Sequence, residues 1–294
     1  MSTAPVTVET GAPDAKHESC CATATLADGT QIGKYQITAG RMRAFVERFA
    51  GDLKSWAATN PAGWDQGWND QLPGNMDDAL QVLGPDGKRG CNIGDAKGGR
   101  TYWQPGNING DADDHSDYPK DTLDEKALNC IQWHMAMALC VYDGGQLASI
   151  DELAKIITND GANGINQWPW TWQDTSGYSA NTADERLSHQ WNYETPVAAQ
   201  RQDPQGGPLD RAGFIAPPGR FPKGYNKLGI ADGVGNMLMW VRDSEKRFAW
   251  TSSWEQHPKD WNNTLNPTNS TWKGKPGDGD TEGYYAIGGR CSFK

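Results

Sequence analysis

Signals for regular helices end near Asn159, just past the middle of this chain of 294 residues. Beyond that point glycine, proline, asparagine and tryptophan recur in short runs. Such runs favour turns and short strands, and they are poor material for a helical bundle or a solenoid. The chain therefore needs a fold that holds long ordered loops on a small frame of helices and strands, which is an α+β architecture.

Three helices are predicted in the first half, over residues 38–49, over residues 133–142 and from residue 149 onward. In each, apolar residues recur at the spacing that places them on one helix face. These residues are Met42, Phe45, Val46 and Phe49, then Ala136, Met137, Cys140 and Val141, then Leu153, Ile156 and Ile157. Thr38 is a suitable N-cap for the first helix. Ser149 and Glu152 have the spacing of a capping box at the start of the third.

The composition excludes some classes of protein. The net charge is −10 and lysine and arginine do not cluster, so no nucleic-acid partner is expected. No apolar run approaches the ~20 residues of a membrane span. Residues 1–22 are polar and lack a secretory-signal pattern. We expect them to be a flexible lead-in to a single domain over residues 23–294.

Six cysteines bear on the compartment. None forms a Cys-x-x-Cys pair, so a zinc site is not indicated. An even number spread along the whole chain fits disulfides, and hence an extracellular or periplasmic location. The alternative is that they are buried free thiols in a cytosolic protein.

Five segments, in this order, resemble the formylglycine-generating enzyme (sulfatase-modifying factor) superfamily. They are IGKYQITAGRMRAFVE at 32–47, ALNCIQWHMAMALCVYDGGQLASIDEL at 127–153, QWPWTW at 167–172, PPGRFPKGYNKLGIADGVGNMLMW at 217–240, and AIGGRCSF at 286–293. The resemblance covers about residues 30–294. It implies a C-type-lectin-like α+β fold, with two main helices beside a small antiparallel core and long ordered loops.

The resemblance also implies one disulfide, between Cys140 of the second helix and Cys291 of the closing strand. Four cysteines remain, and a bridge between sequence neighbours is strained. We therefore expect two bridges that join one pair to the other, although the sequence does not choose between the two possible arrangements. The pairs are Cys20 with Cys21, and Cys91 with Cys130.

Catalysis in this family uses two copper-binding cysteines shortly before the closing strand, because copper(I) needs soft thiolate ligands. Residues 247–285 contain no cysteine, and WTSSW at 250–254 replaces the usual Arg-Gly-Gly-Ser-Trp run. A related branch holds iron with three histidines, whereas the five histidines here are scattered. We therefore expect neither copper nor iron, and an apparently non-catalytic member. His257 could act as an acid or base, but a solvated loop histidine is the simpler interpretation.

The resemblance further implies a structural calcium ion, a hard cation that prefers six to eight oxygen ligands. The matching ligands are Asp232 and the carbonyls of Gly235 and Met237, while Asn192 resembles a ligand of a second calcium site. Met239 stands where relatives have glutamate, and a thioether is a poor calcium ligand. We expect the loop to be mainly structural, with its calcium site weakened or lost.

A second candidate for calcium lies in NGDADDHSD at 109–117. Four of its residues occupy the first, third, fifth and ninth positions of a calcium-loop pattern. They are Asn109, Asp111, Asp113 and Asp117. Asp114 and Lys120 depart from the pattern, and a solvated acidic loop is the alternative.

The C-terminal loops concentrate indoles with amide and hydroxyl groups, a combination suited to recognition. The candidate ligand-binding residues are Trp250, Trp254, Trp261, Asn262, Asn263, Trp272 and Tyr284. The alternative is that these indoles pack beneath the loops as small cores. The sequence predicts a non-enzymatic recognition protein for a protein or glycan ligand. Two alternatives are a metal-dependent oxidoreductase with a rearranged site and a variable protein of a diversity-generating retroelement.

Overall fold

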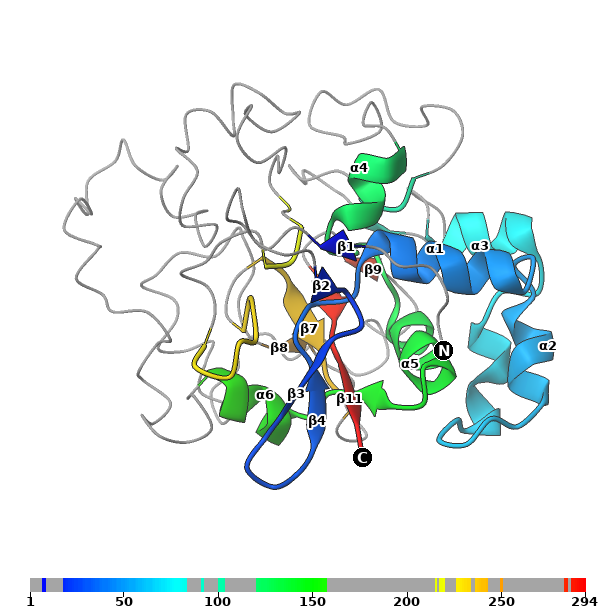
Figure 1. Ribbon diagram of the computed structural model, residues 1–294. Helices are drawn as coiled ribbons and strands as arrows, with labels where there is room; N and C mark the ends of the chain where they lie inside the picture. Colours follow the sequence, from blue (N-terminus) through cyan, green and yellow to red (C-terminus); the bar gives the residue numbers. More distant parts are fainter. Residues whose placement is uncertain are drawn as a thin grey trace.

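The computed structural model describes part of the chain, and every structural statement below concerns that part. The described residues are 7–8, 18–83, 91–92, 100–103, 120–157, 215, 217–219, 226–233, 236–242, 249–250, 283–284 and 287–294. It contains both helices and short strands, with most strands near the two ends of the chain and most helices between them, which confirms the α+β class (Figure 1).

The helices of the described part are α1 Ala39–Arg48, α2 Leu53–Ala58, the 3-10 helix η1 Gln66–Gln71, α3 Met76–Val82, α4 Lys120–Glu125, α5 Trp133–Tyr142 and α6 Ile150–Ile157. The three predicted helices are confirmed as α1, α5 and α6. Thr38 caps α1 by accepting a hydrogen bond from the amide of Arg41 at 3.3 Å. Gly144, with φ of 89°, follows the end of α5 in the left-handed conformation that suits glycine.

The capping box of α6 is also confirmed. The amide of Ser149 donates to the carboxylate of Glu152 at 2.7 Å, and the amide of Glu152 donates to the Ser149 hydroxyl at 3.1 Å. The other helices have six or seven residues each, too short for apolar periodicity to reveal them. The starts of α2, η1 and α3 are nonetheless capped, since Asp52, Asp65 and Asn75 each accept a hydrogen bond from an amide of the first turn.

The described strands are β1 Thr7–Val8, β2 Glu18–Ser19, β3 Thr23–Thr25, β4 Gln31–Gly33, β5 Cys91–Asn92, β6 Gln146–Leu147, β7 Leu238–Trp240, β8 Ala249–Trp250, β9 Gly283–Tyr284, β10 Ile287–Gly289 and β11 Cys291–Phe293. An antiparallel sheet has the order β3-β4-β11-β6, and a second sheet has the order β10-β7-β8. β10 pairs with β7 in parallel, as does β5 with β9. The expected antiparallel core is therefore present but is extended by parallel pairs.

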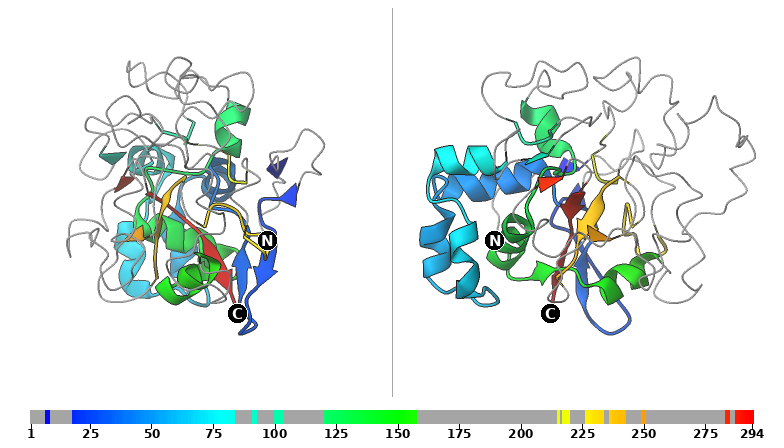
Figure 2. Two further views of the ribbon diagram at one scale, coloured as in Figure 1. Left: turned by 90° about the vertical axis from the view of Figure 1, so that its left-hand side faces the viewer. Right: turned by 180° about the vertical axis from the view of Figure 1, so that it is seen from behind.

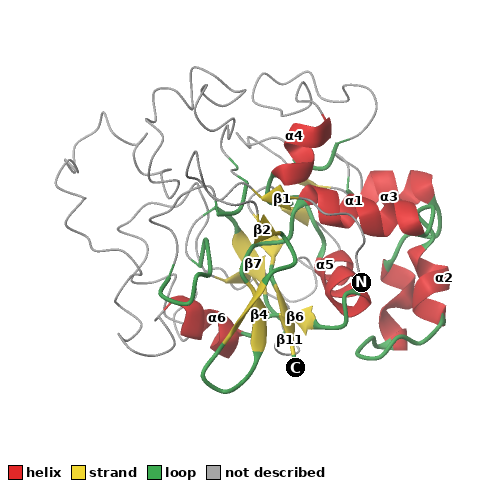
Figure 3. Ribbon diagram, in the orientation of Figure 1, coloured by secondary structure: helices red, strands yellow, loops and turns green. Residues whose placement is uncertain are grey.

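The helices lie on two flanks of this strand region. α1, α2 and α3 lie together on one flank and α6 lies on the other, as the two opposite views in Figures 1 and 2 agree. Figure 3 shows the strands between them. α5 and α1 are the longest described helices, with ten residues each, which matches the expectation of two main helices.

Helix α5 is the centre of the core. The sequence predicted one buried face, but every residue from Trp133 to Val141 is buried, because sheet and helices surround it. Two indoles fix it to the second sheet. Trp133 donates to the carbonyl of Val241 at 2.8 Å, and Trp240 donates to the carbonyl of Ile131 at 2.7 Å. Both indoles are therefore part of the core, and each N–H is paired.

The folded body begins earlier than the expected boundary at residue 22. Glu18 and Ser19 form β2, and the side chain of Cys20 is only 1% exposed. The amide of Lys34 donates to the carbonyl of Ala22 at 2.8 Å and ties this segment to the body. Residues 18–22 are thus part of the fold rather than of a flexible lead-in.

Candidate functional site

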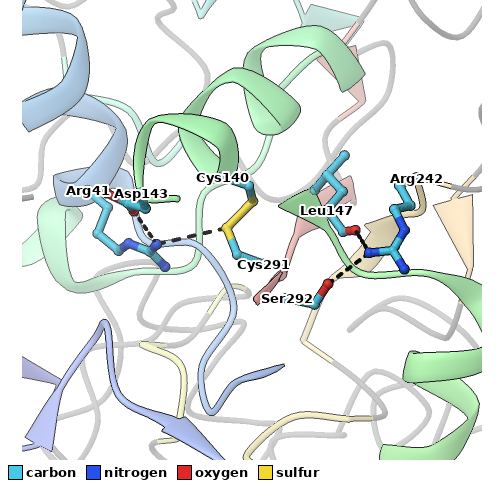
Figure 4. Close-up of a disulfide and its surroundings, with 7 residues drawn as sticks. All are labelled: Arg41, Cys140, Asp143, Leu147, Arg242, Cys291 and Ser292. Carbon is cyan, nitrogen blue, oxygen red and sulfur yellow. Dashed lines mark hydrogen bonds and ion pairs between the residues drawn. A yellow bond between two sulfur atoms is a disulfide. The ribbon is translucent and has the colours of Figure 1, made fainter. Parts of the chain in front are cut away.

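The predicted disulfide between Cys140 and Cys291 is confirmed (Figure 4). Its Cα atoms are 5.3 Å apart, within the usual range for a disulfide. It joins α5 to β11, the strand between β4 and β6, and so fixes the central helix to the first sheet. Both cysteines are buried, which places this bridge in the structural class.

A buried ion pair adjoins the disulfide. Nη2 of Arg41 lies 2.7 Å from Oδ2 of Asp143 and 3.9 Å from Sγ of Cys291 (Figure 4). The two charged side chains are 3% and 8% exposed. Nε of Arg41 and Oδ1 of Asp143 are buried and have no hydrogen-bond partner. The pair was not predicted, because its members lie 102 positions apart in the chain and no local motif links them.

Cys20 and Cys21 are free thiols that lie near the Arg41–Asp143 pair, and the predicted bridges from these two cysteines are wrong. Cys20 and Cys21 were expected to be bridged to Cys91 and Cys130, but both are free, while Cys130 is disulfide-bonded. The turn that follows β2 directs Cys20 inward, against Tyr35 and Ala231, and leaves Cys21 exposed. Because Cys130 is already part of a disulfide, it is not available to either thiol.

The two thiols interact directly. Their sulfur atoms are 3.9 Å apart, the range of a sulfur hydrogen bond. That contact, the positive charge of Arg41 and a hydrogen bond from Ser19 lower the pKa of Cys21 to about 6, although partial burial and Asp143 oppose the shift. The same contact, followed by burial, raises the pKa of Cys20. At neutral pH the pair is therefore an exposed thiolate backed by a buried thiol.

The loop around Asp232 forms a second buried polar cluster. Oδ2 of Asp232 accepts from the amide of Gly219 at 2.7 Å. Arg290, which separates β10 from β11, donates to the carbonyls of Gly33, Ala231 and Asp232 at 2.7, 2.6 and 3.1 Å. Burial raises the pKa of Asp232 to about 6, against the amide of Gly219 and the charge of Arg290, which lower it.

Described oxygens of this loop already accept hydrogen bonds from other groups of the protein. Gln36 donates to the carbonyls of Asp232 and Met237 at 3.3 and 3.2 Å. The side chain of Met239 lies in an apolar cluster with residues such as Leu26 and Ile32. As arranged, these groups do not fit a calcium ion, which needs several free oxygens. That the calcium site is weakened or lost stays a prediction, which the variant Met239→Glu tests.

The remaining predicted site residues lie outside the described side chains. This holds for the second calcium ligand, the loop carbonyl and the recognition residues, which are Asn192, Gly235, Trp254, Trp261, Asn262, Asn263 and Trp272. It holds as well for the acidic loop at 109–117 and for His257. Trp250 and Tyr284 are placed in β8 and β9, but only their backbones are described.

Metal-binding clusters and membrane-spanning helices are both absent from the described part. No group of three or more histidine, cysteine or acidic side chains there is arranged to hold a metal ion. None of its helices has the length and apolar character that crossing a bilayer requires. The copper site of the resembled family falls in residues 247–285, where the sequence supplies no cysteine, so that segment does not fit copper(I).

Comparisons with known proteins place this fold. The family model FGE-sulfatase, the sulfatase-modifying factor enzyme 1-like domain, matches residues 3–276. A similar solved structure is that of PvdO from Pseudomonas aeruginosa, with 14% sequence identity and a TM-score of 0.41 over 99% of this chain and 98% of that one. No curated protein matches. The architecture is a C-type-lectin-like α+β fold of the formylglycine-generating-enzyme type. The chain belongs to the FGE-sulfatase family.

Proposed function

We propose that this protein is a non-enzymatic recognition protein, which engages a protein or glycan ligand through the loops of residues 251–282. The observation that carries the proposal is the composition of that segment, in which three tryptophans alternate with amide and hydroxyl residues. An indole offers a large apolar face and one N–H donor, which suits both sugar rings and protein surfaces.

The strands at the two ends of this segment support the proposal. β8 is held against β7 through the pairing of Met239 with Trp250. β9 is held against β5 through the pairing of Asn92 with Tyr284. A loop whose two ends are fixed loses less conformational entropy on binding than a free segment does. The Cys140–Cys291 disulfide further supports a site of action in an oxidising compartment.

Binding arrays test the proposal. The purified protein is applied to an oligosaccharide array and to an array of folded extracellular protein domains. A triple variant, Trp254→Ala, Trp261→Ala and Trp272→Ala, is compared with the matched surface variant Asp28→Asn. We expect binding on one array, with an affinity at least about 10-fold weaker in the triple variant, since hot-spot tryptophans contribute 2 kcal/mol or more each. Equal binding by both variants, or binding on neither array, would contradict the proposal.

Family membership favours a second candidate, a metal-dependent oxidoreductase with a rearranged site. Metal analysis of the protein purified without chelators, together with O₂ consumption in the presence of a cysteine-containing peptide, distinguishes the two. Stoichiometric copper or iron with O₂ consumption would establish the enzyme and displace the recognition proposal. A third candidate, the retroelement variable protein, requires a neighbouring reverse-transcriptase gene and a template repeat in the source genome, and their absence would remove it.

A further inference from the structure

We propose that Cys20 and Cys21 form a thiol–disulfide exchange site, in which Cys21 attacks an exposed disulfide and Cys20 resolves the resulting mixed disulfide. This site is independent of ligand binding by the C-terminal loops. It takes disulfides and dithiols as its substrates, either small molecules or exposed loops of other proteins.

The geometry assigns a different role to each thiol. Cys21 is exposed and can be reached by an external disulfide, whereas Cys20 is 1% exposed and can react only with a group already attached to its neighbour. Their sulfur atoms are 3.9 Å apart, so the Cys21 sulfur of a mixed disulfide lies within reach of Cys20 after a small rotation. Free thiols in a chain that also holds disulfides show that this pair is not a structural bridge.

The charges around the pair favour attack by Cys21. Its pKa of about 6 makes it mostly thiolate at neutral pH, and the thiolate is the nucleophile in disulfide exchange. The groups that act on it are Cys20, Ser19 and Arg41, which favour the thiolate, and Asp143, which opposes it. Arg41 is buried, and its charge acts on Cys21 more strongly than the opposing charge of Asp143 does.

The same contacts lower the pKa of the resolving thiol, Cys20, after the first step. The largest cause of the raised pKa of Cys20 is its hydrogen bond with Cys21. Once Cys21 is part of a mixed disulfide it carries no negative charge, and that cause is removed. Burial still raises the pKa of Cys20, but Arg41 lowers it and no longer acts on a neighbouring thiolate. Cys20 therefore becomes more acidic at the stage at which it has to attack.

The reaction balances in two steps. The Cys21 thiolate attacks R–S–S–R, which forms a Cys21–S–S–R bond and releases one R–S⁻. Cys20 then loses its proton to solvent and attacks the Cys21 sulfur, which forms the Cys20–Cys21 bond and releases the second R–S⁻. In total the protein is oxidised by two electrons and the external disulfide is reduced to two thiols. The reverse sequence oxidises an external dithiol.

The oxidised pair is expected to be strongly oxidising. Neighbouring Cα atoms are about 3.8 Å apart across a trans peptide, whereas relaxed disulfides span roughly 4.4–6.8 Å. Strain raises the reduction potential of a disulfide, and a stabilised thiolate in the reduced form raises it further. The site is therefore suited to removing electrons from dithiols, with a small disulfide in excess as the source of oxidation.

Incubation with oxidised glutathione tests the site. Cleavage after Lys16 and Lys34 yields a peptide, residues 17–34, that contains Cys20 and Cys21 and no other cysteine. After acid quenching and alkylation, its mass reports whether the thiols are free, joined to glutathione or joined to each other. We expect the unmodified protein to pass through a transient glutathione adduct and to end with the two thiols joined. The buried Cys140–Cys291 bridge should survive the reduced glutathione that reopens the pair.

Two variants separate the roles. Cys20→Ser should retain one glutathione permanently, because the resolving thiol is missing. Alkylation of Cys21 in the unmodified protein should titrate near pH 6. Cys21→Ser should react at least about 10-fold more slowly, because the remaining thiol is buried. If a variant does not fold, the transient glutathione adduct of the unmodified protein still tests the proposal. A persistent adduct on the unmodified protein, or reaction no faster than that of Cys21→Ser, would overturn the proposal.

Discussion

Arg41 of helix α1 and Asp143, the C-cap residue of helix α5, form a buried ion pair with 2.7 Å between Nη2 and Oδ2 (Figure 4). The pair joins the two main helices at the point where α5 is also bridged to β11. A buried ion pair contributes little relative to apolar packing, but the loss of one partner leaves the other charge desolvated and uncompensated. The stability of the core therefore depends on Asp143, which balances the buried charge of Arg41.

We predict that Asp143→Asn lowers the free energy of unfolding by about 3 kcal/mol, because Arg41 then remains buried without a counter-charge. Urea denaturation followed by tryptophan fluorescence measures the effect. The matched control is Asp28→Asn, which removes the exposed partner of Lys155 and should leave the midpoint unchanged, since solvent screens that pair. Equal midpoints for the two variants would show that the buried pair does not stabilise the core.

The Cys140–Cys291 disulfide is predicted to provide a large part of the stability. It joins residues 151 positions apart, and the loop-entropy model gives about 5 kcal/mol as its upper contribution. The double variant Cys140→Ala, Cys291→Ala should therefore lose several kcal/mol in guanidinium denaturation, with Cys21→Ala as an exposed control that loses little. A double variant as stable as the control would contradict a structural role for the bridge.

Local chemistry in the sequence predicted local structure well. Capping residues predicted the starts of two helices, because caps act within one helical turn. Thr38 predicted the start of α1, and Ser149 with Glu152 predicted the start of α6. The short helices α2, α3 and α4 were missed, since they offer too few residues for a periodic pattern. The Cys140–Cys291 bridge came from the family resemblance and not from spacing.

Contacts between distant segments were the part that the sequence could not supply. The free state of Cys20 and Cys21 depends on how one turn directs two neighbouring side chains, which spacing does not encode. The Arg41–Asp143 pair depends on the packing of two helices. The hydrogen bonds that Arg290 and Gln36 donate to the carbonyl of Asp232 likewise join distant segments and become visible only in three dimensions.

Asp232 is predicted to make stability depend on pH. Burial raises its pKa to about 6, above the value near 3.8 of an unperturbed carboxyl group. Between these values the folded protein binds more protons than the unfolded chain, so the free energy of unfolding falls as the pH rises from about 4 to 6. The fall amounts to at most about 3 kcal/mol for a shift of about two pH units.

The matched variant for this prediction is Asp232→Asn, which keeps an oxygen for the Gly219 amide and tolerates the positive φ of 49° at this position. Denaturation midpoints are measured at several pH values for both proteins. The difference between them should change across the interval from pH 4 to 6 and be constant above it. Parallel curves over the whole interval would mean that the carboxyl group titrates normally.

The last prediction concerns calcium and position 239. Met239 packs in an apolar cluster with Leu26, Ile32 and Val241. Met239→Glu introduces the glutamate that the family resemblance implies at this position, but it places a carboxylate among apolar side chains, at a cost of several kcal/mol. We expect the thermal midpoint of this variant to fall by more than about 5 °C and to be the same in calcium chloride as in a chelator.

The control for this substitution is Met239→Leu, which keeps the volume and polarity of the side chain and should cost less than about 1.5 kcal/mol. The unmodified protein is measured in the same two buffers. A calcium-dependent rise in the midpoint of Met239→Glu alone would show that the oxygens of the 232–237 loop can release Gln36 and turn toward a cation. A rise in the unmodified protein as well would mean that calcium binds without the missing carboxylate, and that the loop is a metal site after all.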